Sequence, residues 1–171
     1  MMAELMPKER LQPSLLDRLT DDAPHKTRES RQQRVLSIGA LRSAVLRDLG
    51  WLLNSDNFTG EPLDGYPLVA HSVLNYGLPD LAGHTLSSTD MGVLEHTLRQ
   101  VILDFEPRIL RNTLKVRAVI AAREMNHNAI TFEVEGELWA QPLPERMYLK
   151  TQVDLESGNI SIAENARTSS A

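Results

Sequence analysis

A glutamate and an arginine flank a single proline at residues 106–108, and this tripeptide has the clearest chemical potential in the sequence. Proline fixes its own backbone and restricts the residue before it, so Glu106 and Arg108 are held on a stiff corner. The planar guanidinium of Arg108 can offer a fork of donors to a carboxylate or a carbonyl. Two interpretations stay open: the pair grips a partner, or it is an internal clamp between a helix and a sheet.

The other polar residues form no recognisable catalytic or metal-binding pattern. The five histidines have no i, i+4 partner, and the absence of cysteine excludes thiol nucleophiles, disulfides and Cys-ligated metals. The P-loop, GxGxxG and GxSxG patterns are also missing. Glu133, Glu135 and Glu137 alternate along a predicted strand, about 7 Å apart in a row rather than converging on an ion. We therefore expect no metal site and no cofactor.

Composition and charge limit the partners. The 171 residues carry a formal net charge of −5, with 42% hydrophobic and 24% charged residues, which is typical of one folded domain. Acidic residues outnumber basic ones by 23 to 18, which argues against a whole-surface attraction to nucleic acid. The sequence has neither an apolar run long enough to span a membrane nor a signal-peptide core. We expect a cytoplasmic protein with no nucleic acid partner and no membrane insertion.

Two helices are predicted before the corner. Residues 30–33, Ser-Arg-Gln-Gln, match a capping box, and apolar residues then recur at helical spacing from Val35 to about Leu53. A second capping signature at residues 87–90 precedes a helical stripe that ends at Phe105, before Pro107. Between the helices, residues 58–70 and 72–81 contain glycine and proline and are expected to be loops.

After the corner the hydrophobic period changes to two, which predicts strands. Residues 114–120 and 130–138 alternate apolar and polar side chains around a polar turn. A register in which paired residue numbers sum to 252 places Ala118 opposite Val134 inside and Arg117 opposite Glu135 outside. A third strand at 147–155 and a short fourth at 160–162 follow. The expected fold is α+β, with two main helices packed on one face of a small antiparallel sheet of three to four strands.

The N-terminal residues differ in character from this domain. Charges and prolines are frequent there, and Leu15, Leu16 and Leu19 form one short apolar cluster. A helix of about two turns is too short to hold its shape alone, so we expect these leucines to order on a partner. The predicted organisation is a mobile arm at 1–29, a single α+β domain at 30–163 and a polar tail at 164–171.

Three segments together resemble a known family. They are the leucine-containing segment 15–19, residues 72–81 (Ser-Val-Leu-Asn-Tyr-Gly-Leu-Pro-Asp-Leu), and residues 105–108 (Phe-Glu-Pro-Arg). The sequence resembles the TssE family, small baseplate wedge proteins of bacterial type VI secretion systems that are related to a wedge protein of contractile-tailed phages. The resemblance covers about residues 11–155.

This resemblance implies a structural role between the baseplate and the contractile sheath, with no enzymatic activity. Glu106, Pro107 and Arg108 would grip the wedge core, with TssF and TssG as partners, and TssK through the assembled wedge. An exposed sheet edge, on the third strand or the hairpin, would accept strands from the sheath subunits TssB and TssC and seed sheath assembly. The arm leucines would dock on a neighbouring wedge subunit, at a baseplate on the inner-membrane side of the secretion complex.

The same family is often labelled lysozyme-like, which supplies a rival hypothesis of peptidoglycan hydrolysis by carboxylates such as Glu95 or Glu106. A retaining site needs two carboxylates about 5–5.5 Å apart and an inverting site about 6.5–9.5 Å. Eight aromatic rings are few for both a core and a sugar-binding cleft. We therefore favour the structural role.

Overall fold

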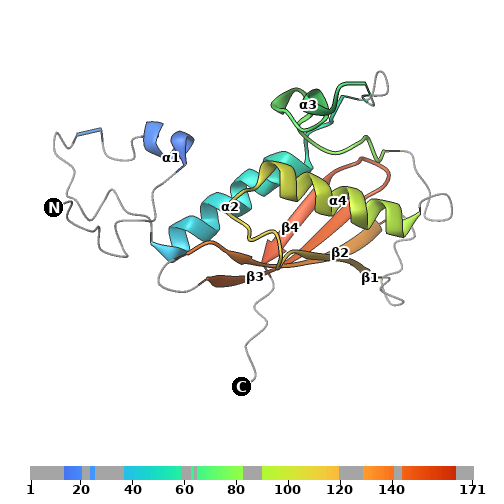
Figure 1. The fold of residues 1–171 in the computed structure, drawn as a ribbon. Helices are drawn as coiled ribbons and strands as arrows, with labels where there is room; N and C mark the ends of the chain where they lie inside the picture. Colours follow the sequence, from blue (N-terminus) through green and yellow to red (C-terminus); the bar gives the residue numbers. More distant parts are fainter. Residues whose placement is uncertain are drawn as a thin grey trace.

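The computed structural model describes residues 14–20, 24–25, 37–58, 63, 65–82, 90–119, 129–140 and 144–164. Helices and a sheet form two layers (Figure 1). In chain order the elements are the helices α1 (Leu15–Leu19), α2 (Ile38–Leu53) and α3 (Pro67–Ala70), the 3-10 turn η2 (Val73–Asn75), the helix α4 (Met91–Phe105), and the strands β1 (Lys115–Val119), β2 (Ala129–Leu138), β3 (Glu145–Asp154) and β4 (Ile160–Glu164). The α+β class predicted from the sequence is confirmed.

Helix α2 begins later than predicted. Ser37 has an extended backbone, and its hydroxyl accepts the amide of Ala40 at 3.1 Å, so Ser37 is the N-cap. The prediction of one continuous helix from residue 30 is therefore wrong. An N-cap serine bonds to the free amides of the first turn, so α2 begins directly after Ser37. The capping box at 30–33 and Val35 lie outside the described residues. The predicted end at Leu53 is confirmed, with Asn54 as the C-cap.

Helix α4 follows the prediction closely. The Asp90 carboxylate accepts the amides of Gly92 and Val93 at 2.9 and 3.3 Å, which caps the first turn. The helix ends at Phe105, and Glu106 is its C-cap. Pro107 has no amide hydrogen to continue the ladder, so the chain turns there toward the sheet.

Four antiparallel strands lie in the order β1-β2-β3-β4. The predicted register of the first hairpin is wrong by two residues: Ala118 pairs with Phe132 rather than Val134, and Arg117 with Glu133 rather than Glu135. Alternation fixes only which face a side chain occupies, and a shift of two preserves the faces. The offset is fixed by the turn before β1, where the Thr113 hydroxyl accepts the amide of Glu137 at 2.9 Å. The polar turn predicted at 126–128 lies outside the described residues.

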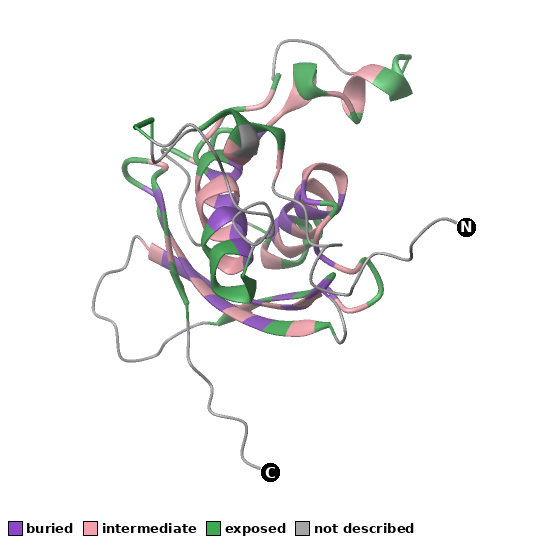
Figure 2. Cartoon of the chain, turned by 90° about the vertical axis from the view of Figure 1, so that its left-hand side faces the viewer, coloured by how far each residue is buried: buried purple, intermediate pink, exposed green. Residues whose placement is uncertain are grey.

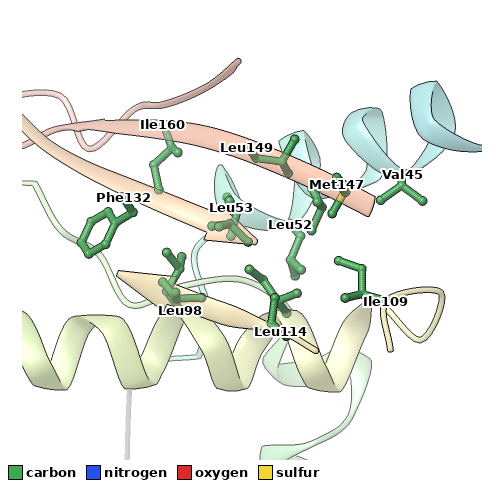
Figure 3. Close-up of a cluster of buried hydrophobic side chains, with 14 of the residues drawn as sticks. Val45, Leu52, Leu53, Leu98, Ile109, Leu114, Phe132, Met147, Leu149 and Ile160 are labelled. Atoms are coloured by element: carbon green, nitrogen blue, oxygen red, sulfur yellow. The ribbon is translucent and has the colours of Figure 1, made fainter. Parts of the chain in front are cut away.

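The core fills the space between the helices and one face of the sheet. Helix α4 packs on β1, and α2 packs on the β4 side. Figure 2 shows buried residues along the facing sides of both layers. In Figure 3, Leu52 and Leu53 of α2 and Leu98 of α4 point toward strand residues that include Phe132 and Met147. Two salt bridges also connect α2 to the sheet, from Arg42 to Glu145 at 2.7 Å and from Arg42 to Glu164.

Loops were predicted at residues 58–70 and 72–81, but the described residues of these segments contain the short helix α3 and the turn η2. Residues 56 and 78 form an isolated parallel bridge, and Leu78 is buried. Gly77 has a φ of +117°, and a Cβ there would lie 2.0 Å from the Ser55 carbonyl oxygen. Only glycine therefore fits at this crossing.

No helix in the described part of the chain has both the length and the apolar character needed to cross a membrane.

Candidate partner-binding groove

Backbone hydrogen bonds connect the Glu-Pro-Arg corner to α4 before Pro107 and to the sheet after it. The amide of Glu106 donates to the Ile102 carbonyl at 2.9 Å, which connects the corner to α4. Beyond Pro107, the Arg108 carbonyl accepts the amide of Trp139 at 2.7 Å, and Ile109 bridges to Leu138 beside the sheet. The stiff helix-to-sheet corner expected from the sequence is thus present.

Glu106 and Arg108 pair with each other. Arg108 donates from Nε to Oε1 of Glu106 at 2.6 Å and from Nη2 to Oε2 at 2.5 Å, and its backbone amide also reaches Oε1 at 3.1 Å. Glu106 is 3% exposed. This is a two-pronged, charge-assisted contact, the strongest type of side-chain hydrogen bonding. The internal clamp considered from the sequence is therefore present, and any grip on a partner must coexist with it.

Arg108 also begins a row of alternating charges, which we call the charge chain: Glu106, Arg108, Asp48, Arg47 and Asp17. Arg108 Nη2 donates to Oδ2 of Asp48 on α2 at 2.6 Å. Oδ1 of the same carboxylate accepts Nε and Nη2 of Arg47 at 2.9 and 2.8 Å. Arg47 Nη1 then donates to Oδ1 of Asp17 on α1 at 2.6 Å. The charge chain thus connects the corner, α2 and the N-terminal helix.

The charge chain shifts the protonation equilibria of its members. Burial disfavours charge on Arg108, but the hydrogen bonds and charge of Glu106, followed by those of Asp48, outweigh it and raise the pKa of the guanidinium. Burial likewise disfavours the Asp17 carboxylate, yet bonds from Arg47 and Ser14 lower its pKa below the usual value. Both groups are therefore charged at neutral pH.

An open groove of about 570 Å³ lies beside the corner. Its lining is more apolar than polar and includes rings from three elements. Tyr76, after η2, packs edge-on against Phe105 with ring centroids 5.2 Å apart. Arg47 lies over the Trp51 ring at 5.1 Å and connects the groove wall to the charge chain. The lining residues are Ser14, Leu16, Asp48, Trp51, Leu52, Tyr76, Phe105, Glu106, Pro107 and Arg108.

The groove brings together most of the site residues predicted from the sequence. Leu16 lines it together with Glu106, Pro107 and Arg108, although the two sets are about 90 residues apart in the chain. Leu15 and Leu19 do not line it and are 71% and 75% exposed. The short helix predicted for these leucines is present as α1, while the remainder of the predicted arm lies mostly outside the described residues.

Sequence reasoning missed the residues of α2 that join the two sets. Asp48 and Trp51 are one helical turn apart, at i and i+3, so they share a face of α2 beside the buried stripe. An Arg-Asp pair followed by an exposed tryptophan was the available signal. Nothing in the sequence, however, indicated that this face meets the corner.

One side-chain nitrogen of Arg108 has no hydrogen bond within the part of the chain that the structure describes. Arg108 Nη1 is buried and, within the described residues, has no hydrogen-bond partner. Arginine has five N–H donors, and the hydrogens on Nη1 are the ones that Glu106 and Asp48 leave unused.

The carboxylates of the hydrolase hypothesis do not form a catalytic pair. Glu95 and Glu106 are separated by eleven residues along and just beyond α4, which corresponds to about 16 Å at 1.5 Å per residue. That separation exceeds both glycosidase geometries. Glu95 Oε1 accepts the amide of Ala118 at 2.6 Å, and both oxygens of Glu106 bind Arg108. Both carboxylates therefore accept hydrogen bonds that connect parts of the fold.

No group of three or more acidic or histidine side chains in the described segments could hold a metal ion.

A family model described as "Baseplate wedge protein gp25" matches residues 40–143. The match covers more than half of the 171 residues and contains most of α2, all of α4, the Glu-Pro-Arg corner and the first two strands. No curated protein and no solved structure matches the chain.

Proposed function

We propose, since the chain belongs to the gp25 family of baseplate wedge proteins, that it is a component of the baseplate of a type VI secretion system. In this role it joins the wedge subunits to the first ring of the contractile sheath, in the cytoplasm at the inner-membrane side of the secretion complex. The observation that carries the proposal is the groove, where an apolar surface adjoins a rigid charged corner.

We assign the wedge contact to this groove, with TssF and TssG as the direct partners and TssK joined through the assembled wedge. Protein interfaces are typically anchored by buried aromatic and arginine side chains. The groove offers Trp51, Tyr76 and Arg108 as lining residues. Because the carboxylate of Glu106 is already occupied, its part in binding is to hold Arg108 in place, while exposed Pro107 is free to contact the partner.

A second surface, at the edge of the sheet, is proposed to receive strands from the sheath subunits TssB and TssC. The third strand, named from the sequence as one candidate edge, is paired on both sides and is excluded, because its backbone groups are used within the sheet. The edges are β1 and β4. An edge accepts a new strand through backbone groups that point away from the sheet.

Side chains from the helices occupy the two edges to different extents. At β1, the Glu95 carboxylate accepts the Ala118 amide, and Arg99 donates to the Leu114 carbonyl at 3.3 Å, so both ends are engaged. At β4, the Asn54 side chain binds both the amide and the carbonyl of Ile160, each at 2.9 Å. Among the described residues, side-chain bonds of this kind engage only the start of β4, and we therefore propose residues 162–164 as the part that adds sheath strands.

The wedge contact is tested by capture of wedge subunits on the purified full-length chain. Arg108→Lys keeps the positive charge but loses the guanidinium fork, so we expect capture of TssF and TssG to be lost while the fold remains. Arg146→Lys is the matched control, because Arg146 is exposed on β3, away from the groove. Undiminished capture by a folded Arg108→Lys variant would reject the groove as the wedge contact.

The sheath contact is tested with proline at outward-facing edge positions. Strand alternation places the backbone groups of Ile162 on the same side as those of Ile160, away from β3, so Ile162→Pro removes an edge donor without breaking a ladder bond. We expect a folded protein that no longer supports sheath assembly in cells. Val116→Pro makes the same change on β1 and should leave assembly intact. The reverse result would assign the sheath to β1.

A further inference from the structure

Helix α1 is too short to be stable by itself, yet it has a defined place beside the groove. Five residues form little more than one turn, and isolated helices of this length do not persist in water. Its own stabilisation is local: the Ser14 hydroxyl accepts the amide of Asp17 at 3.3 Å and donates to its carboxylate at 2.6 Å. The position of α1 relative to the domain must therefore come from contacts with α2 and the groove.

The contact that fixes this position is electrostatic. Asp17 is the charged residue of α1 that bonds to the domain, and Arg47 binds it from α2 at 2.6 Å. The Asp17 side chain is 14% exposed, so the pair is partly shielded from water, which strengthens it relative to a surface pair. Arg47 is itself held by Asp48 and the Trp51 ring, which prevents it from swinging away.

This contact leaves the leucines of α1 available. Leu16 lines the groove, whereas Leu15 and Leu19 face solvent. Trp51, on the groove wall, is 52% exposed. Leu16 and Trp51 line the same groove, so these apolar surfaces adjoin one another where the Asp17–Arg47 pair places α1. One partner segment could then cover the leucines of α1 and the groove together.

We propose that Asp17 and Arg47 are positioning residues that fix α1 beside the Glu-Pro-Arg corner, so that α1 and the groove form one continuous binding surface. The inference rests on the proposed wedge contact of the groove. The partner segment it fits is apolar, because the groove lining and the exposed leucines of α1 are mainly apolar. In this proposal Asp17 and Arg47 do not contact the partner. They affect binding only because they fix the position of α1.

The position of α1 can be measured without any partner. The chain has no cysteine, so Leu19→Cys and Ser43→Cys introduce a unique pair for nitroxide labels on α1 and α2. We expect one narrow distance distribution in the parent chain and a broad one after Asp17→Asn. Arg47→Lys, which keeps a cation, should remain closer to the parent. An unchanged narrow distribution in Asp17→Asn would overturn the positioning role.

Binding is measured on the unlabelled full-length chain with a purified complex of TssF and TssG. Asp17→Asn should weaken binding about two- to fivefold, the range expected for loss of one partly exposed ion pair. Asp56→Asn, an exposed carboxylate away from the groove, is the control and should bind as the parent does. If the parent does not bind, the proposed wedge contact fails. If the parent and Asp17→Asn bind equally, that contact stands and the positioning role fails.

Discussion

Arg108 closes a two-pronged contact on Glu106, two residues earlier in the chain, and extends the same Nη2 atom to Asp48 on α2. The corner is thus a clamp between the end of α4 and the middle of α2, and it is also one wall of an open groove. The two interpretations left open by the sequence are compatible, because the clamp fixes the direction of an arginine whose side chain also lines the groove.

Removing the acid of the clamp should lower stability. Glu106→Gln leaves Arg108 with one carboxylate instead of two, and we expect a loss of about 1–3 kcal/mol in the free energy of unfolding. The loss is below that for a fully buried pair, since Arg108 retains Asp48 and some solvent contact. Urea denaturation measures it. Asp56→Asn, an exposed carboxylate away from the corner, is the control, and equal stability of the two variants would contradict the clamp.

The crossing at Gly77 gives a second stability prediction. Gly77→Ala must abandon a φ of +117° or displace the Ser55 backbone, so it should destabilise by more than about 1 kcal/mol. Gly50→Ala is a matched control within α2, where a Cβ meets nothing within 4 Å. It should stabilise by about 0.5–1 kcal/mol, because alanine favours helix. Thermal unfolding of both variants checks the opposite signs.

Asn54 should hold the first residue of β4. Its amide binds the backbone of Ile160 twice, so Asn54→Asp removes one donor and places a carboxylate against the Ile160 carbonyl. We expect a loss of about 1–3 kcal/mol and faster hydrogen exchange of the Ile160 amide. Asn112→Asp, on an exposed turn, makes the same chemical change as a control. Unaltered exchange at Ile160 would refute this role.

The contact of α1 with α2 should depend on pH with a definite sign. The pKa of Asp17 is lowered in the folded chain, so its contribution is complete above the unfolded value of about 3.9. It is lost as the pH falls through the lower folded value. Carboxyl carbon NMR should place the Asp17 midpoint below that of a free aspartate, with the α1 amide signals moving in the same acidic range. In Arg47→Met the midpoint should rise.

The hydrolase hypothesis also has a direct test. Because Glu95 and Glu106 are far apart and structurally bonded, we expect the purified chain to release no sugars from peptidoglycan. Hen-type lysozyme activity on the same substrate would serve as a positive control for the assay. Turnover that disappears in Glu95→Gln or Glu106→Gln would overturn the structural interpretation.

Local rules predicted much of the fold. The helical spacing of apolar residues predicted the end of α2 and nearly all of α4. The change of the hydrophobic period to two predicted the strands of the sheet. The Glu-Pro-Arg corner was recognisable because proline acts on its immediate neighbours. These features depend on residues within a few positions of one another, and such interactions can be read from the chain directly.

Features that depend on distant residues were missed or misplaced. The predicted hairpin register was wrong by two residues, since alternation cannot distinguish even shifts. The deciding hydrogen bond runs from the Glu137 amide to the Thr113 hydroxyl. Asp48 was missed because its role depends on where α2 crosses the corner. The edge position of β4, rather than β3, was likewise decided by pairing across the whole sheet.

The sequence by itself determined the α+β class, the corner and the short leucine helix, because periodicity, proline and capping are local effects. Only the tertiary structure decided that these parts meet. Charges at positions 17, 47, 48, 106 and 108 are scattered along the chain, and folding places them in one row because α2 lies between α1 and the corner. Of this charge chain, Asp48, Glu106 and Arg108 line the groove, and burial of Glu106 fixes that end of the chain in the groove wall.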